Sequence, residues 1–322
     1  MDNSTILVLA DPAEPQLAML NSLPNGTHWT AGQCPEAFAP AAATADVVLN
    51  WSGSLDLFRR VWAMAPHLRW AHSRSAGLDG VLFPELVESP VPLTNARGVF
   101  SESLAEFVLG AALFFAKDFR RMVRSQAAGC WDPFDIDELS RQTMGIVGYG
   151  DIGRACARRA KAFGMRVLAL RRRPELAAGD PQVDAVCPPD RILEMLPQCD
   201  YVVAAAPLTS ATRGLIGARE IAALKPTAVV INVGRGPVID EAALIRALEQ
   251  GRVRGAALDV YDTEPLPPGH PFYRLGNVLL SPHCADHTRT WLEDAMRFFL
   301  NQFERYRAGL PLLNVVDKRS GY

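Results

Sequence analysis

Short apolar runs alternate along this chain with stretches in which apolar residues recur every three or four positions. Such runs are typical of buried strands, and the recurring stretches are typical of amphipathic helices. Strands that alternate with helices predict an α/β fold with parallel sheets. We predict helices over 55–64, 101–121, 152–163, 290–306 and from Asp240 to Gly251, and strands over 6–10, 46–49, 68–72, 91–95, 144–147, 165–170, 200–206, 227–233, 255–260 and 277–280.

The stretch 143–173 has the order strand, glycine turn, helix, strand, which is a βαβ unit. Gly148, Gly150 and Gly153 form the pattern G-x-G-x-x-G at the turn. The first glycine permits the tight turn, the second lets a pyrophosphate approach the backbone, and the third lets helix and strand pack closely. A glycine-rich turn in another kind of α/β protein is the alternative, but the flanking strand and helix favour a dinucleotide site.

Composition narrows the classes of function. A chain of 322 residues exceeds the size at which single cores stop growing, so we expect two domains. The net charge of −2, from 33 basic and 35 acidic residues, predicts no general attraction for nucleic acid or anionic membrane. The start, MDNSTILVLADP, lacks the basic region of a secretory signal, which predicts the cytoplasm. The six cysteines form no C-x-x-C pair or Cys/His cluster, which predicts no metal site.

Polar residues follow the predicted strands. Asp259, Glu264 and the Ser281-Pro282-His283 turn come after strands in the second half of the chain. Because the carboxyl ends of parallel strands meet at one edge of a sheet, we expect these polar side chains to gather there and to form the reactive site. In the first half, the turn of Ser75, Ala76 and Gly77 follows a strand, and its backbone N–H groups could bind a ligand. An ordinary glycine turn is the equal alternative.

Several stretches closely resemble the D-isomer-specific 2-hydroxyacid dehydrogenases: TNARGVFSESLAEF, GIVGYGDIG, INVGRGPVIDEAALIRAL, GAALDVYDTEPLP and NVLLSPHCA. The resemblance is densest from about Thr94 to Ala285. It implies two doubly wound parallel-sheet domains, a Rossmann-type cofactor domain and a flavodoxin-like substrate domain, with a cleft between them. The implied cofactor domain is 101–286, and the implied substrate domain is discontinuous, 1–100 plus 287–322.

The resemblance implies three catalytic residues, Arg235, Glu264 and His283. Their chemistry suits a 2-oxo acid, because a guanidinium can orient the carboxylate and polarise the keto oxygen. Histidine titrates near neutrality and can protonate the developing alkoxide, while a neighbouring carboxylate favours its protonated form and orients its ring. Each residue alone is more often structural, but together after successive strands they favour catalysis. His72, His270 and His287 lack such partners, so we predict structural roles for them.

The end of the second strand of the βαβ unit predicts the cofactor. Members of the family that use NAD carry an acid there to bind the ribose 2′-hydroxyl, whereas this chain has Arg171, followed by Arg172 and Arg173. Arginines can pair with a 2′-phosphate, so we predict that NADP(H) is preferred over NAD(H). The alternative is that the three arginines are only a solvated edge and that NADH binds through other contacts.

The resemblance also implies ligand contacts. Asp259 would contact the nicotinamide carboxamide, and Pro207 with Thr212 would line the adenosine side. Asn95 stands near the hinge. The predicted substrate-binding residues are Ser75, Ala76, Gly77, Asn95, Arg235 and His283, and the predicted cofactor-binding residues are Gly148, Tyr149, Gly150, Asp151, Ile152, Gly153, Arg171, Arg172, Arg173, Ala206, Pro207, Thr212, Val233, Gly234, Arg235, Asp259 and His283.

The predicted function is the NAD(P)H-dependent reduction of a small 2-oxo acid, of the glyoxylate/hydroxypyruvate type, to the D-2-hydroxy acid, with His283 as general acid. A 3-phosphoglycerate dehydrogenase-type enzyme is one alternative, although Ser73 stands where such enzymes carry an arginine and Arg74 would have to replace it. A non-catalytic, dinucleotide-sensing protein like the family's corepressors is another. The resemblance predicts a homodimer formed through the helix and arm of 104–141, and the composition predicts neither nucleic acid nor membrane as partner.

Overall fold

The computed structural model describes residues 3–321. The chain divides into two compact units, one formed by Ser101–Thr288 and the other by the described parts of 1–100 and 289–322. The chain returns to the discontinuous unit after Thr288, two residues after the predicted boundary at 286/287. Residues 1, 2 and 322 of the predicted substrate domain lie outside the described residues. Among the helices of 3–321, none has the length and apolarity needed to cross a membrane.

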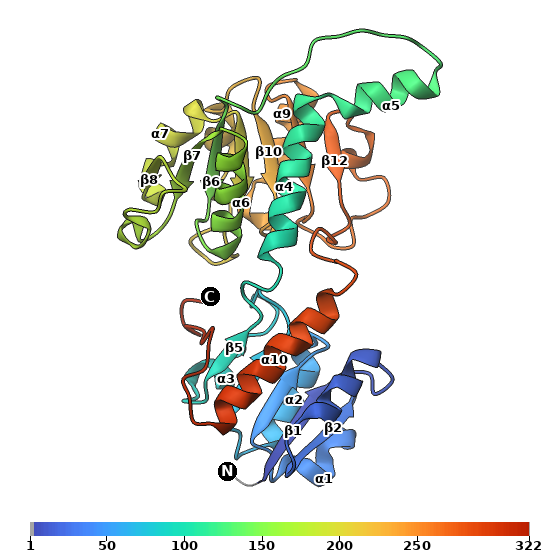
Figure 1. Ribbon diagram of the computed structural model, residues 1–322, viewed down its shortest axis with the longest axis vertical. Coiled ribbons are helices and arrows are strands. Elements are labelled where there is room, and N and C mark those ends of the chain that lie inside the picture. Colours follow the sequence, from blue (N-terminus) through green and yellow to red (C-terminus); the bar gives the residue numbers. More distant parts are fainter. Residues whose placement is uncertain (1–2, 322) are drawn as a thin grey trace. The chain divides into compact units, whose positions relative to one another are not determined.

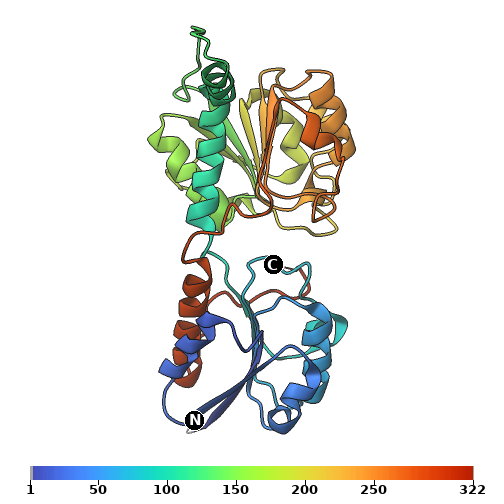
Figure 2. The same ribbon diagram turned by 90° about the vertical axis from the view of Figure 1, so that its right-hand side faces the viewer.

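The discontinuous unit contains a parallel sheet of the order β2-β1-β3-β4-β5, which is the predicted flavodoxin-like order. Side chains alternate across it, so Ala71 faces one layer of helices while Trp70 stacks on Phe299 of the opposite layer. Figure 2 shows these two layers. The strands are β1 (Ser4–Leu9), β2 (Thr27–Gly32), β3 (Val47–Asn50), β4 (Trp70–Ser73) and β5 (Leu93–Asn95), and the helices are α1 (Ala39–Ala42), α2 (Leu55–Met64) and α3 (Pro84–Glu88) on one face, with η1 (Pro15–Ser22) and α10 (Trp291–Arg307) on the other.

The sequence did not predict β2. Its residues, THWTAG, are mostly half-buried, because β2 is an edge strand that pairs with β1 alone within the described sheet. An edge strand needs no continuous apolar run, so the pattern that revealed the inner strands was missing here.

The unit Ser101–Thr288 contains a parallel sheet of the order β12-β11-β10-β9-β6-β7-β8. Counted across the sheet from β8 to β11, the six strands follow the Rossmann order, as predicted. Figure 1 shows α4 and α6 on one face, and α7, α8 and α9 share a buried apolar cluster with the other face. The strands are β6 (Thr143–Val147), β7 (Arg166–Leu170), β8 (Ala185–Cys187), β9 (Tyr201–Ala204), β10 (Val229–Asn232), β11 (Gly255–Leu258) and β12 (Val278–Leu280), and the helices are α4 (Ser101–Ala116), α6 (Asp151–Ala162), α7 (Ile192–Met195), α8 (Ala218–Ala222) and α9 (Glu241–Glu249).

The helix predicted over 101–121 is two helices, which corrects the prediction. The chain turns at Asp118, whose φ of +48° is left-handed and whose side chain caps α5 (Phe119–Ala127) by accepting from the Arg121 N–H. Asp tolerates this conformation better than most residues, so no Gly or Pro marks the break in the sequence. Figure 1 shows α5 projecting beyond the sheet of its unit, and its side chains are not buried within the described chain.

Candidate active site

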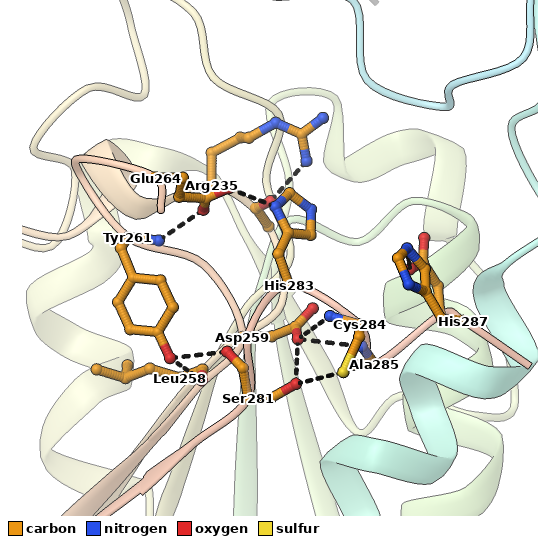
Figure 3. Close-up of polar contacts among 12 residues, drawn as sticks. Arg235, Leu258, Asp259, Tyr261, Glu264, Ser281, His283, Cys284, Ala285 and His287 are labelled. Carbon is orange, nitrogen blue, oxygen red and sulfur yellow. Dashed lines mark hydrogen bonds and ion pairs between the residues drawn. The ribbon is translucent and has the colours of Figure 1, made fainter. Parts of the chain in front are cut away.

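His283 and Glu264 form a hydrogen-bonded pair after β12 and β11. The Nδ1 atom of His283 lies 2.6 Å from Oε2 of Glu264, and Oε1 of Glu264 accepts from the Tyr261 N–H at 2.9 Å. Both carboxylate oxygens are therefore engaged, as Figure 3 shows. A carboxylate at Nδ1 directs the proton of that nitrogen to itself and leaves Nε2 to face other groups. The side chains are 41% and 34% exposed, so the pair is accessible to a small ligand.

Asp259, at the end of β11, holds the turn that carries His283. Its Oδ1 atom accepts from the Ser281 hydroxyl at 2.6 Å, from the Cys284 N–H at 2.9 Å and from the Ala285 N–H at 3.0 Å. His283 itself adopts a left-handed φ of +52°, which is uncommon for a residue with a Cβ. The buried carboxylate of Asp259 therefore stabilises a turn in which the backbone of His283 is strained. Such backbone strain is common at functional sites.

The Arg235 turn and the Glu264 turn pack backbone against backbone. Arg235 follows β10, and its Nη1 donates to the Gly234 carbonyl at 2.8 Å. The Asn232 side chain braces the turn, because Nδ2 donates to the Arg235 carbonyl at 3.1 Å and Oδ1 accepts from the Gly234 N–H at 3.1 Å. A Cβ on Gly236 would lie 2.0 Å from the Tyr261 carbonyl carbon. Arg235, Glu264 and His283 thus all project from the carboxyl edge of one sheet (Figure 3).

The three glycines of the βαβ turn differ in their surroundings. Gly148 has a φ of +102°, and a Cβ there would lie 2.5 Å from the Ala206 nitrogen. A Cβ on Gly153 would lie 2.6 Å from the Gly148 carbonyl oxygen in the turn and 3.1 Å from Cγ2 of Ile146 in β6, so helix and strand pack closely there. Around Gly150 nothing among the described residues lies within 4 Å of such a Cβ. The backbone at the start of α6 is therefore open where a pyrophosphate would bind, so these residues fit a dinucleotide.

Arg171 lies at the end of β7 with a buried, unpartnered donor. Its Nη1 atom has no hydrogen-bond partner among the described residues. Burial, together with the neighbouring Arg154 and Arg173 guanidiniums, lowers the pKa of Arg171. An orphaned donor among like charges favours the binding of an anion, and a 2′-phosphate of a dinucleotide supplies one.

Comparison with known proteins decides the family. Residues 109–285 match the NAD-binding domain of the D-isomer-specific 2-hydroxyacid dehydrogenases. The chain belongs to this family. The dehydrogenase is 34% identical over 295 residues to the glyoxylate/hydroxypyruvate reductase B of Salmonella agona. The matched region covers 85% of this chain and 89% of that protein.

Two further relatives of the dehydrogenase are informative. The D-3-phosphoglycerate dehydrogenase of Methanocaldococcus jannaschii is 34% identical over 276 residues, covering 85% of this chain but 52% of that protein. A crystal structure of a D-isomer-specific 2-hydroxyacid dehydrogenase from Xanthobacter autotrophicus, in complex with NADPH and MES, superposes with a TM-score of 0.85 over the whole of both chains at 30% identity.

The remaining predicted cofactor residues of the dehydrogenase follow strands β6, β7, β9 and β10 of one sheet. Thr212 braces the loop after β9 by donating to the Pro207 carbonyl at 2.6 Å. Ala206 backs Gly148, and a Cβ on Gly234 would lie 2.7 Å from the Ala206 carbonyl oxygen. The Val233 N–H donates to the Ala204 carbonyl at 3.0 Å. Tyr149 lies within the glycine turn, and Asp151 and Ile152 are the first two residues of α6. Arg172 and Arg173 follow Arg171.

Four predicted substrate residues lie in the other unit of the dehydrogenase. Ser75, Ala76 and Gly77 follow β4, and Asn95 ends β5. The Asn95 Nδ2 atom donates to the Ala76 carbonyl at 2.6 Å, so the structure brings these residues together. The predicted cleft between the domains stays a prediction.

The structure also reveals residues that the sequence did not single out for the site. Asp180 accepts from the Tyr149 hydroxyl at 2.9 Å, and Arg154 Nε lies 4.0 Å from the same carboxylate. Burial first, and then Asp180, raises the pKa of Tyr149. Arg154 lies one residue after the glycine pattern, a signal that could have been used, whereas Asp180 stands in a loop with no motif to mark it.

Proposed function

We propose that this dehydrogenase reduces a small 2-oxo acid, of the glyoxylate/hydroxypyruvate type, to the D-2-hydroxy acid with NADPH. The observation that carries the proposal is the 2.6 Å contact of His283 with Glu264 at the sheet edge that also bears Arg235. The likeness to glyoxylate/hydroxypyruvate reductase B supports the substrate class.

The proposed mechanism divides the work among the three side chains. Arg235 binds the substrate carboxylate with its guanidinium fork and polarises the keto oxygen. A bound nicotinamide supplies the hydride to the keto carbon. His283, protonated, gives its Nε2 proton to the resulting alkoxide, which yields the hydroxyl group, while Glu264 stabilises and orients the ring through Nδ1. Ser75, Ala76 and Gly77 remain candidate donors to the carboxylate, and Asp259 remains the candidate partner of the nicotinamide carboxamide.

The proposed preference for NADP(H) over NAD(H) depends on Arg171. Its buried, unpartnered Nη1 and the nearby Arg154 and Arg173 favour a ligand with an extra phosphate. The related Xanthobacter autotrophicus structure is a complex with NADPH, which supports this choice.

A homodimer through the arm 104–141 is part of the proposal. Apolar side chains are exposed on this arm within the described chain, including Phe119, Met122, Val123 and the 96% exposed Trp131. Exposed apolar side chains on one segment favour a protein partner, and a second copy of the chain offers the same surface.

A 3-phosphoglycerate dehydrogenase-type activity is the second candidate, because one relative of that name is 34% identical. The test is a panel of glyoxylate, hydroxypyruvate, pyruvate, phenylpyruvate and 3-phosphohydroxypyruvate against NADPH and NADH. We expect the highest kcat/KM for glyoxylate or hydroxypyruvate with NADPH, whereas the highest value for the phosphorylated acid would establish the alternative. Binding of NADPH without turnover of any acid would instead indicate a dinucleotide sensor. His283→Ala should lower kcat by on the order of 100-fold or more while NADPH still binds.

A further inference from the structure

Glu264 is carried by a loop that is rich in proline. This Glu264 loop, residues 261–270, connects β11 to the short helix η7 (Pro271–Arg274) and contains Pro265, Pro267 and Pro268. Proline has no N–H group, so these three positions donate no backbone hydrogen bond. Within the loop the Tyr261 N–H donates to Glu264 and the His270 N–H donates to the Pro267 carbonyl at 3.2 Å, and groups outside the loop add to these contacts.

One carboxylate holds both ends of the Glu264 loop. Glu241, the first residue of α9, accepts from the Asp262 N–H through Oε2 at 3.3 Å. Its other oxygen, Oε1, lies 3.1 Å from Nε2 of His270 at the far end of the loop. The two side chains are 19% and 15% exposed, so water screens this contact little. The helix presents the carboxylate rigidly, because Asp240 caps α9 by accepting from the Ala243 N–H at 2.9 Å.

The hydrogen bonds of His270 assign its tautomer. Its Nδ1 atom accepts from the Phe272 N–H at 3.4 Å, and a neutral imidazole then carries its proton on Nε2, where it can donate to Glu241. The ring also lies 4.9 Å from the Phe272 ring, which packs against it. His270 is thus fixed on both sides and can transmit the position of α9 to the end of the loop.

We propose that Glu241 and His270 are positioning residues that clamp the Glu264 loop and thereby hold Glu264 against His283. The inference rests on the catalytic roles proposed above for Glu264 and His283. It assigns a role in turnover to His270, which the sequence suggested to be merely structural. Glu264 reaches His283 from within the clamped segment, so a shift of the loop changes the contact on which proton delivery depends. A misplacement of about 1 Å can cost roughly 100-fold in rate.

A double-mutant cycle tests the clamp. Glu241→Ala in the full-length enzyme with NADPH should lower kcat roughly 10- to 100-fold and leave the Kd for NADPH unchanged. In a Glu264→Ala background the same change should alter kcat less than about twofold, because the contact that it positions is already gone. An equal loss of kcat in both backgrounds would overturn the proposal, since a general weakening of the fold acts in either.

A second variant covers the case in which Glu241→Ala does not fold. His270→Asn keeps an acceptor for the Phe272 N–H but is too short to reach Glu241, so it should give the same pattern. Glu249→Ala, at the exposed end of α9, is the matched control and should retain the wild-type kcat. If Glu264→Ala lowers kcat while Glu241→Ala and His270→Asn do not, the clamp is wrong and the catalytic assignment stands. If Glu264→Ala keeps the wild-type kcat, both fail.

Discussion

A Cβ atom on Gly236 would lie 2.0 Å from the carbonyl carbon of Tyr261, far inside van der Waals contact. Gly236 follows Arg235, and the N–H group of Tyr261 donates to Glu264 at 2.9 Å. The missing side chain of one residue thus sets the separation between the turns that carry two proposed catalytic groups. The Tyr261 hydroxyl extends the connection, since it bonds to the carbonyls of Leu258 at 2.9 Å and Ser281 at 2.8 Å.

Gly236→Ala should separate the Arg235 and Glu264 turns. We expect kcat/KM for the 2-oxo acid to fall roughly 100-fold, because the two groups no longer meet the substrate in register, while NADPH still binds. Steady-state kinetics and cofactor fluorescence measure these two quantities. Gly276→Ala is the control, since its Cβ would meet nothing within 4 Å among the described residues. A Gly236→Ala enzyme with wild-type kinetics would show that the turns tolerate separation.

Arg171→Ala should weaken NADPH binding and spare NADH. Removing the partner of a 2′-phosphate should cost about 2–5 kcal/mol for NADPH, whereas NADH has no phosphate to lose. Calorimetric titration with each reduced cofactor measures the difference. Arg166→Ala, at the other end of β7 where the side chain contacts Gln198 at 3.0 Å, should change neither affinity. Equal NADPH affinity in the wild type and Arg171→Ala would contradict the proposed role of Arg171.

We expect His72 to make the stability of the fold depend on pH. Its Nδ1 lies 2.7 Å from the Thr94 hydroxyl, which accepts from Trp70 Nε1 at 2.8 Å, and its buried Nε2 has no hydrogen-bond partner among the described residues. Burial lowers the pKa of His72 from 6.5 to about 3. The folded state therefore keeps the ring neutral over a pH range in which the unfolded chain binds a proton.

The free energy of unfolding should fall as the pH drops from 6.5 towards 3, with His72 contributing at most about 1.4 kcal/mol per pH unit. Urea unfolding at a series of pH values measures the slope. His72→Leu should flatten it, because no proton-binding group remains at that position. The exposed His67→Leu controls for the loss of any histidine and should keep the wild-type slope. Identical slopes in the wild type and His72→Leu would refute this account.

Three kinds of local pattern in the sequence were informative. Apolar runs revealed the inner strands, because those strands are covered on both faces, but they missed the half-exposed edge strand β2. Apolar periodicity located α2, yet it ran straight through the break at Asp118, since a left-handed Asp leaves no mark in a hydrophobic pattern. The motifs marked Gly148, Arg235, Glu264 and His283 because each follows a predicted strand.

The sequence alone therefore determined the family, the two α/β folds and the side chains that carry the proposed chemistry, since short-range patterns and motifs encode these. Only the tertiary structure showed how those side chains are held. Asp259 accepts hydrogen bonds from the His283 turn, Gly236 leaves room for the Tyr261 backbone, and Glu241 contacts His270. The partners in each of these contacts lie between 20 and 30 residues apart in the chain. Such contacts depend on which strand ends become neighbours in the sheet, and that pairing is decided by packing over the whole unit rather than by any local stretch.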